Sequence, residues 1–299
     1  PRGADPTAEV GEAAGSAAGM TIVLVGDHVT ALPEESMEKC AVDYILTGGD
    51  YDFLLLNLCN HLSKGEELEP GIWHREKSKF QILNNKVEEK GRLYRHDQNR
   101  SSRVTPNYKR RHSGADSPGV SGEDAIESTS NSPPEGYSST GHFVLNHDLN
   151  ELPFIDRDLT EWELYAYDNS NYARVPGTYT MFGRDCYWGR CTFCSWTTLF
   201  PGKHYRQMSV ERALDEVGHI IENYPVREIM DDSGTFPVGD WLRKFSLGMI
   251  ERGYNERVRI SCNMRFNSGL TREDYHLMGK AGFRFLLYGL ESVTQESLD

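Results

Sequence analysis

A repeated alternation of strand-like and helix-like segments after residue 178 most constrains the fold of this 299-residue chain. Ser209 is placed to cap a helix whose apolar residues recur at helical spacing, a second helix starts at Asp240, and Thr271 with Asp274 resembles a capping box for a third that ends at Gly282. This order predicts a parallel sheet, either a barrel or a doubly wound sheet, with functional groups at the carboxyl ends of its strands. The four strand-like runs are residues 178–182, 226–230, 258–262 and 283–290.

The segment from residue 20 to residue 80 has a shorter alternation of the same kind. Residues 21–25 form a β-branched run typical of a buried parallel strand, and residues 42–46 read as a second short strand. Helices are expected from Pro33 and over residues 51–62. A β-α-β-α order is typical of an open parallel sheet, and this one is too short to be a whole domain.

The remaining segments are poor in large apolar residues. We expect disorder over residues 1–19 and a linker or disordered insertion over residues 81–142, with order resuming near Phe143. The predicted protein is therefore α/β, with one incomplete domain over residues 20–80 and a second over residues 143–299. We expect the chain to be part of a longer protein.

Charge and hydropathy exclude several classes of partner. The net charge is −13 and is spread along the chain, which offers no electrostatic footprint for nucleic acid. No apolar run approaches the roughly 18–20 residues needed to span a bilayer, and the N-terminus has no secretory pattern. We therefore expect a cytoplasmic protein, and in that reducing compartment cysteines are more often metal ligands or catalytic groups than disulfides. The scattered Cys40, Cys59 and Cys262 read as buried thiols.

Three further cysteines lie close together in the sequence. Cys186, Cys191 and Cys194 have the spacing C-x4-C-x2-C. Three thiolates can hold an iron–sulfur cluster, and a cluster with only three protein ligands leaves one iron open for another molecule. A structural zinc site with His204 as fourth ligand is the alternative, although zinc ribbons pair two C-x2-C knuckles and a second knuckle is absent from the sequence.

Polar residues follow each of the predicted strands after residue 178. Asp231 and Asp232 follow the second strand, Asn263 and Arg265 the third, and Glu291 the fourth. In a barrel all of these strand ends surround one mouth, beside the three cysteines. Their coincidence strengthens the interpretation of the cysteines as a functional site.

The cysteine spacing, with Phe193 before the last cysteine, resembles the cluster loop of radical S-adenosylmethionine enzymes, with one residue more in the first gap than is usual. Further segments resemble the cobalamin-binding branch of that family in the expected order, and the resemblance covers residues 20–80 and 143–299. The segments that carry it are Tyr205-Arg206, Ser209, 230–236, 263–265, 281–282 and 289–292, with 25–34 and 42–45 similar to the last third of the cobalamin domain.

The resemblance implies a fold and a set of cofactors. The fold is the C-terminal part of a Rossmann-like cobalamin-binding domain, followed by the first half of a partial (β/α)6 radical S-adenosylmethionine barrel. The three cysteines hold a 4Fe–4S cluster, and the open iron binds S-adenosylmethionine, which is cleaved to a 5′-deoxyadenosyl radical. The cobalt-binding Asp-x-His-x-x-Gly loop of the branch is absent from the sequence. His28 follows a strand in a different loop and reads as a pocket-lining or ordinary loop histidine.

The same resemblance implies roles for the other candidate residues. Phe193 packs near the adenine, and Asp232 lies where relatives bind the methionyl ammonium group. Arg265 is a candidate for the methionyl carboxylate and Glu291 for the ribose or the amine. Asn263, beside Arg265 at the same strand end, belongs to the same cofactor-binding set.

The activity expected from this resemblance is methylation of an unactivated carbon through cobalamin. A cyclisation, rearrangement or oxidation without methyl transfer is the second enzymatic interpretation. The non-enzymatic interpretations are a structural zinc module and a binding protein that keeps only the fold. Such an enzyme needs a reducing partner such as flavodoxin or ferredoxin. Its substrate, a small molecule or a peptide, is not specified by the sequence.

Overall fold

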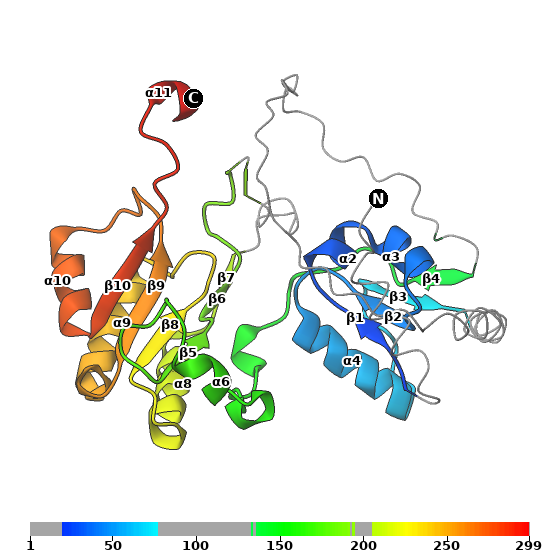
Figure 1. Cartoon of the computed structure of the whole chain (residues 1–299), viewed down its shortest axis with the longest axis horizontal. Coiled ribbons are helices and arrows are strands. Elements are labelled where there is room, and N and C mark those ends of the chain that lie inside the picture. Colours follow the sequence, from blue (N-terminus) through cyan, green and yellow to red (C-terminus); the bar gives the residue numbers. More distant parts are fainter. Residues whose placement is uncertain (1–19, 77–132, 134–135, 192, 195–204, 299) are drawn as a thin grey trace, which may run out of the picture. The chain divides into compact units, whose positions relative to one another are not determined.

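The protein comprises two compact units, residues 1–144 and residues 145–299. The computed structural model describes residues 20–76, 133, 136–191, 193–194 and 205–298 (Figure 1). The segments predicted to be disordered therefore lie outside the described residues, except for the end of the predicted insertion.

The first unit contains a four-stranded mixed sheet with the order β1-β2-β3-β4. Strands β1 and β2 are parallel, whereas β3 and β4 each pair antiparallel with the preceding strand. The predicted β-α-β-α order is present, and the antiparallel extension was not predicted. The elements are β1 (Val23–Leu24), α2 (Asp27–Ala31), α3 (Pro33–Lys39), β2 (Tyr44–Leu46), α4 (Tyr51–Lys64), β3 (Ile72–Arg75) and β4 (Tyr137–Ser139).

Strand β4 lies inside the range that was predicted to be a linker or disordered insertion. Its sequence, Tyr-Ser-Ser, has no apolar run, so the pattern of the segment alone did not indicate a strand. Pairing with β3 supplies the stabilisation instead: Ser139 lies opposite Trp73, and the Thr140 hydroxyl oxygen accepts a hydrogen bond of 2.9 Å from the Ile72 amide. A strand of the first unit, β4, thus already precedes Phe143, where the sequence predicted the return of order.

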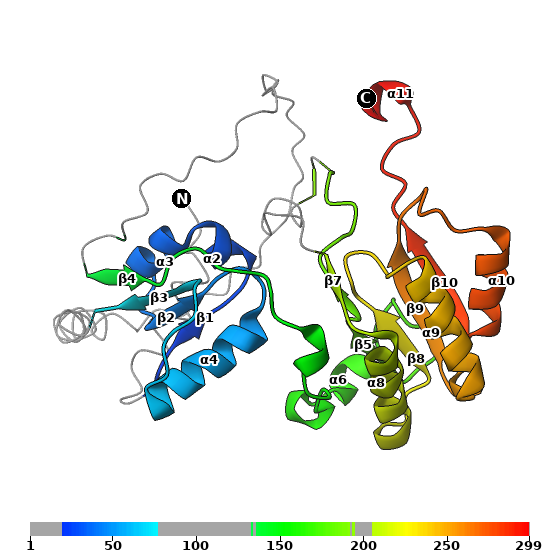
Figure 2. The ribbon, with the colours of Figure 1, turned by 180° about the vertical axis from the view of Figure 1, so that it is seen from behind.

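Helices cover both faces of the first sheet (Figures 1 and 2). Successive residues of a strand point to opposite faces, and in β2 Ile45 and Leu46 are both fully buried. Ile45 packs with residues of α2 and α3, whereas Leu46 packs with residues of α4. The first unit is therefore a layered α/β structure with a core on each side of a short sheet.

The second unit contains a four-stranded, wholly parallel sheet with the order β5-β8-β9-β10. The strands predicted from the sequence are present, with boundaries shifted by up to two residues. They are β5 (Gly177–Thr180), β8 (Glu228–Asp231), β9 (Arg259–Met264) and β10 (Phe283–Tyr288). The helices that follow β5, β8 and β9 are α8 (Val210–Asn223), α9 (Asp240–Glu251) with the short 3-10 helix η3 (Tyr254–Glu256), and α10 (Arg272–Lys280).

The strand order distinguishes between the two predicted architectures, a β/α barrel and a doubly wound sheet. Strands adjacent in the chain are adjacent in space, so right-handed crossovers all proceed in one direction and place their helices on one face. Helix α9 contacts both α8 and α10, as this arrangement requires (Figure 2). A doubly wound sheet reverses its order, whereas a segment of a β/α barrel does not. The described strands form an open sheet, and closure into a barrel stays a prediction.

Short elements surround this sheet. Strands β6 and β7 form a separate antiparallel pair beside the cysteine loop. The buried Arg157 guanidinium fixes the segment before β5, because it donates to the Thr178 hydroxyl at 2.9 Å and pairs with the buried Glu216 carboxylate of α8 at 3.5 Å. The short elements are η1 (Leu149–Glu151), η2 (Arg157–Thr160), α6 (Glu163–Ala166), β6 (Gly183–Arg184), β7 (Arg206–Gln207) and α11 (Gln295–Leu298).

The predicted helix caps are confirmed. The Ser209 hydroxyl accepts a hydrogen bond from the Arg212 amide at the start of α8, and Thr271 with Asp274 forms a complete capping box on α10. Helix α10 ends at Lys280, slightly earlier than predicted. Within the described residues, no helix has the length and apolar character required to cross a membrane.

Replacement of Asp274 by alanine should destabilise the second unit by about 1–2 kcal/mol, the usual range for a lost cap and a buried pair. The Asp274 carboxylate accepts hydrogen bonds from the Arg243 guanidinium and from the Thr271 amide, and these hold its pKa well below the ordinary range. Its contribution is therefore present above about pH 4 and is lost as pH falls further. Urea unfolding at pH 7 and pH 3 measures both effects.

The matched control is Asp240→Ala. Asp240 pairs with the same Arg243 but is 83% exposed, compared with 5% for Asp274. An exposed ion pair contributes about 0–1 kcal/mol, so this variant should unfold nearly as the wild type does. Equal destabilisation by the two substitutions would contradict the role of the capping box.

Candidate functional site

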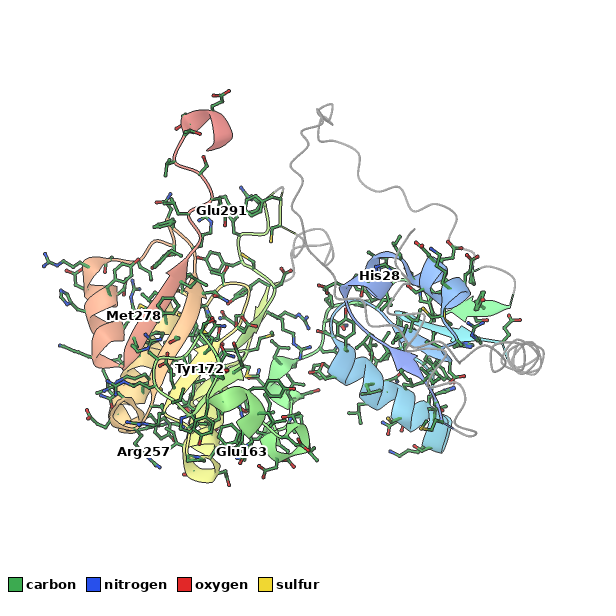
Figure 3. The ribbon with its side chains drawn as sticks, in the orientation of Figure 1. His28, Glu163, Tyr172, Arg257, Met278 and Glu291 are labelled. Carbon is green, nitrogen blue, oxygen red and sulfur yellow. The ribbon has the colours of Figure 1, made fainter. Side chains whose placement is uncertain are left out.

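Parallel pairing brings the candidate residues to one edge of the second sheet. The cysteine loop follows β5, Asp231 ends β8, Asn263 and Arg265 lie at the end of β9, and Glu291 follows β10. Figure 3 shows Glu291 beyond the carboxyl end of β10, at the opposite end of this unit from Arg257. The predicted convergence of strand ends is therefore present in the described sheet.

The carboxylate of Asp231 fixes the root of the cysteine loop. One oxygen accepts a hydrogen bond of 2.7 Å from the Phe182 amide, just after β5, and the other accepts one of 3.2 Å from the Ser233 amide. The Ser233 hydroxyl in turn accepts a hydrogen bond of 2.9 Å from the Gly183 amide. Asp231 is completely buried, and burial raises its pKa to about 7.

The two adjacent aspartates, Asp231 and Asp232, have different surroundings. Asp231 is buried and accepts hydrogen bonds from backbone amides, whereas Asp232 is exposed at the edge of the sheet. The Asn263 amide group donates to the Asp232 carboxylate at 3.4 Å and to the Ser233 carbonyl oxygen at 3.3 Å. Asp232 and Asn263 are thus neighbours, and Asp232 is the member of the pair that is open to a ligand.

Cys186 is held against the end of β8. Its sulfur lies 2.9 Å from the hydroxyl oxygen of Thr235, a residue that is only 3% exposed. The preceding residue, Asp185, has a φ of 71°, in the left-handed region that few residue types other than glycine, asparagine and aspartate adopt. Sequence reasoning did not single out Thr235, although it lies inside the segment 230–236 that carries the family resemblance.

The other two cysteines share an electrostatic neighbourhood with Cys186. The pKa of the Cys191 thiol is raised, first by burial and then by the charges of Cys194 and Cys186. The same thiol is influenced by Arg265, whose charge lowers its pKa, and by Glu291, whose charge raises it. Residues from the cysteine loop, β9 and the segment after β10 therefore lie near one another.

The three cysteines of the loop have the chemistry required to ligate an iron–sulfur cluster or another thiolate-bound metal. All three cysteines are free thiols and are partly buried, and thiolate is the ligand that iron–sulfur clusters use. Among the described residues, however, no three His, Cys, Asp or Glu side chains are arranged to hold a metal ion. His204, the possible fourth zinc ligand, lies outside the described residues.

Trp188 connects the cysteine loop to Arg265. The Arg265 guanidinium lies over the Trp188 ring, 3.6 Å from its centroid, and the Arg190 guanidinium lies 5.0 Å from the same centroid. Within the part of the chain that the structure describes, Arg265 forms no ion pair with a carboxylate. Stacking orients the guanidinium plane and leaves its N–H groups available to an anion.

Tyr187 has a buried hydroxyl group without a hydrogen-bond partner among the described residues. Its ring packs edge-on against Tyr205 at a centroid distance of 5.8 Å. Burial raises the pKa of Tyr187, while the nearby charge of Arg265 lowers it. An unpartnered buried hydroxyl costs free energy, so a ligand that reached this group would remove that cost.

Other predicted residues have simpler surroundings. Phe193 is 68% exposed, and Cys40 and Cys262 are buried as predicted. Cys59 is exposed on α4, so its prediction as a buried thiol was wrong; the apolar stripe of that helix faces the sheet through Leu54 and Leu58 instead. His28, labelled in Figure 3, belongs to helix α2 of the first unit, so its expected position in a loop was wrong.

The fold and the site define a class of protein: an α/β protein with a cysteine loop at the carboxyl edge of a parallel sheet. No family model matches the chain, and no solved structure matches it. The chain is 24% identical, over 280 residues or 93% of its length, to a protein of Pyrococcus horikoshii named an uncharacterized methyltransferase. It spans about half the length of that curated relative, 47%.

Replacement of Asp231 by asparagine should flatten the pH dependence of stability. The pKa of Asp231 rises on folding from 3.8 to about 7, so the folded state binds the extra proton. The free energy of unfolding therefore falls as pH rises between about 4 and about 7, by at most about 1.4 kcal/mol per pH unit. Urea unfolding of the metal-free protein at pH 5 and pH 8 measures this fall, which the variant should lack.

Asp232→Asn is the control, because this neighbouring carboxylate is exposed and its charge contributes less than burial to the raised pKa of Asp231, so most of the wild-type pH dependence should remain. A wild-type slope that persists in Asp231→Asn would rule out Asp231 as its source.

Proposed function

We propose that this protein is a radical S-adenosylmethionine enzyme that cleaves S-adenosylmethionine reductively at a 4Fe–4S cluster held by Cys186, Cys191 and Cys194. The observation that supports the proposal is the Arg265 guanidinium, which lies 3.6 Å from the Trp188 ring centroid of the cysteine loop. It lies at the sheet edge that it shares with Cys186, Cys191, Cys194 and Glu291. These five residues come from three separate segments that the parallel sheet brings to one edge.

The chain's own residues bind and orient the reactants. In a 4Fe–4S cluster the three thiolates would ligate three irons and leave the fourth open to S-adenosylmethionine. A bound cluster would supply the electron that splits the sulfonium group of S-adenosylmethionine. The buried Asp231 carboxylate holds the loop root in place, and the unpartnered Tyr187 hydroxyl is available to a ligand in the site.

Polar groups at the strand ends suit the methionyl part of S-adenosylmethionine. Arg265, stacked on Trp188, offers planar N–H donors to the carboxylate. Asp232 and Glu291 are exposed carboxylates that suit the ammonium group or the ribose, and Asn263 positions Asp232. Phe193 is exposed and offers a ring face to the adenine.

Methyl transfer to an unactivated carbon is the activity we favour. It is supported by the printed name of the Pyrococcus relative, an uncharacterized methyltransferase. Methyl transfer predicts S-adenosylhomocysteine as a product beside 5′-deoxyadenosine. A cyclisation, rearrangement or oxidation would yield 5′-deoxyadenosine without S-adenosylhomocysteine.

The described part of the first unit does not by itself fit cobalamin. Phe143 covers the carboxyl edge of its parallel strands, because a Cβ atom at Gly48 would lie 2.3 Å from the Phe143 ring and one at Gly71 would lie 2.7 Å from the Phe143 Cβ. Cobalamin binding is therefore proposed only for a longer protein, on the family resemblance.

Alanine replacement of Cys186, Cys191 or Cys194 should abolish the cluster. Anaerobic reconstitution of the wild-type protein should give broad visible absorbance and about four irons per chain. Each variant should lose most of this iron and all formation of 5′-deoxyadenosine from S-adenosylmethionine, because each removes one of only three ligands. Iron analysis and chromatography of the nucleoside product measure the two effects.

Cys59→Ala is the matched control, because Cys59 is a free thiol exposed on α4 in the other unit. It should retain wild-type iron content. One zinc and no iron in the reconstituted wild-type protein would replace the proposal with the structural zinc module.

Replacement of Arg265 by glutamine should weaken binding of S-adenosylmethionine to the iron-loaded protein about 10- to 100-fold, the range for a lost hydrogen bond to a charged group. Binding of 5′-methylthioadenosine, which has no carboxylate, should not change. Equilibrium dialysis with both ligands measures the difference.

Arg190→Gln is the control for this pair, because Arg190 lies over the same Trp188 ring at a larger distance and is exposed. Its affinity for S-adenosylmethionine should stay within about threefold of the wild type, as for most exposed charges. An equal loss for both ligands in Arg265→Gln would show that Arg265 shapes the site without recognising the carboxylate.

A further inference from the structure

Thr235 presents a buried hydroxyl to the first of the three cysteines. We infer that Thr235 is a positioning residue that donates a hydrogen bond to the Cys186 sulfur and thereby raises the reduction potential of the metal group held there. The inference rests on the proposed function, since it concerns the same site. It is carried by the 2.9 Å separation between the Thr235 hydroxyl oxygen and the Cys186 sulfur.

The backbone around Thr235 is fixed from several directions. Its carbonyl oxygen accepts a hydrogen bond of 3.3 Å from the Tyr205 hydroxyl, and the amide of the next residue, Phe236, donates to the Asn263 carbonyl oxygen at 2.9 Å. The fully buried Phe236 ring packs edge-on against Trp241. Thr235 is therefore held rigidly where its hydroxyl meets the sulfur.

The cysteine is fixed from its own side as well. Asp231 and Ser233 accept hydrogen bonds from the amides of Phe182 and Gly183, so the strand leading to Cys186 is joined to the segment that carries Thr235. Cys186 and Thr235 therefore lie on two segments that the hydrogen bonds of Asp231 and Ser233 join to each other. Among the described residues, the Cys186 sulfur is the hydrogen-bond partner of the Thr235 hydroxyl.

The direction of the hydrogen bond follows from the chemistry of a metal-bound thiolate. In the free thiol either atom can donate, but a cysteine that ligates a metal has lost its proton. Thr235 must then donate and the sulfur must accept. One-electron reduction places more negative charge on the sulfurs, so this hydrogen bond is stronger in the reduced state and favours reduction.

A contact that serves packing alone would behave differently. Removal of the hydroxyl would then alter stability or iron content and leave the reduction potential unchanged. The potential therefore separates the two roles, and it is independent of turnover.

The test compares Thr235→Val, which has the same shape without the hydroxyl, with Thr235→Ser, which retains it. Full-length protein, reconstituted anaerobically, is titrated potentiometrically with the reduced cluster followed by electron paramagnetic resonance. Thr235→Val should disfavour reduction by three- to tenfold, and tenfold corresponds to about 59 mV for a one-electron couple. Thr235→Ser should stay within twofold of the wild type. Thr180→Val is the control, because Thr180 is a buried threonine at the end of the neighbouring β5.

Unchanged potential in Thr235→Val with a fully loaded cluster overturns the inference, and so does an equal shift in Thr180→Val. If Thr235→Val does not fold by circular dichroism, Thr235→Ala replaces it with the same expectation. Failure of the proposed function looks different, because the wild-type protein itself would then bind no iron.

Discussion

The buried carboxylate of Asp231 is the interaction on which the geometry of the site depends. It joins the backbone after β5 to the backbone after β8, and the Ser233 hydroxyl adds a second link between the same segments. Without these contacts the loop that carries the cysteines would lose two of the links that fix it beside the strand ends. Burial of this carboxyl group is unfavourable, which its raised pKa expresses, and the two backbone amides offset that cost.

Two further side chains of the cysteine loop, a cysteine and a tryptophan, contact residues that follow other strands of the sheet. Cys186 contacts the Thr235 hydroxyl, and Trp188 stacks on Arg265 of the β9 end. Each contact joins the cysteine loop to a different strand of the sheet. The proposed reaction needs this property, since the cysteines that would hold the cluster and the residues that would bind S-adenosylmethionine must be fixed relative to one another.

Sequence patterns predicted the second unit well because its elements are determined locally. The apolar stripe of α8 and the capping box formed by Thr271 and Asp274 each require only neighbouring residues, and the structure has both. Strand β4 was missed because pairing with β3, distant in sequence, stabilises it. The partnership of Asp231 and the roles of Trp188 and Thr235 were missed for the same reason, since they arise from contacts across the sheet and leave no periodic signal in the chain.

The account's central claim is that three cysteines hold a cluster with one iron open to S-adenosylmethionine. Electron paramagnetic resonance of the reduced full-length protein, recorded with and without S-adenosylmethionine, tests this claim most directly. We expect a signal of the reduced cluster whose g values change when S-adenosylmethionine is added, since the ligand then binds an iron. A reduced-cluster signal that is identical with and without S-adenosylmethionine, or no such signal in iron-loaded protein, would contradict the account.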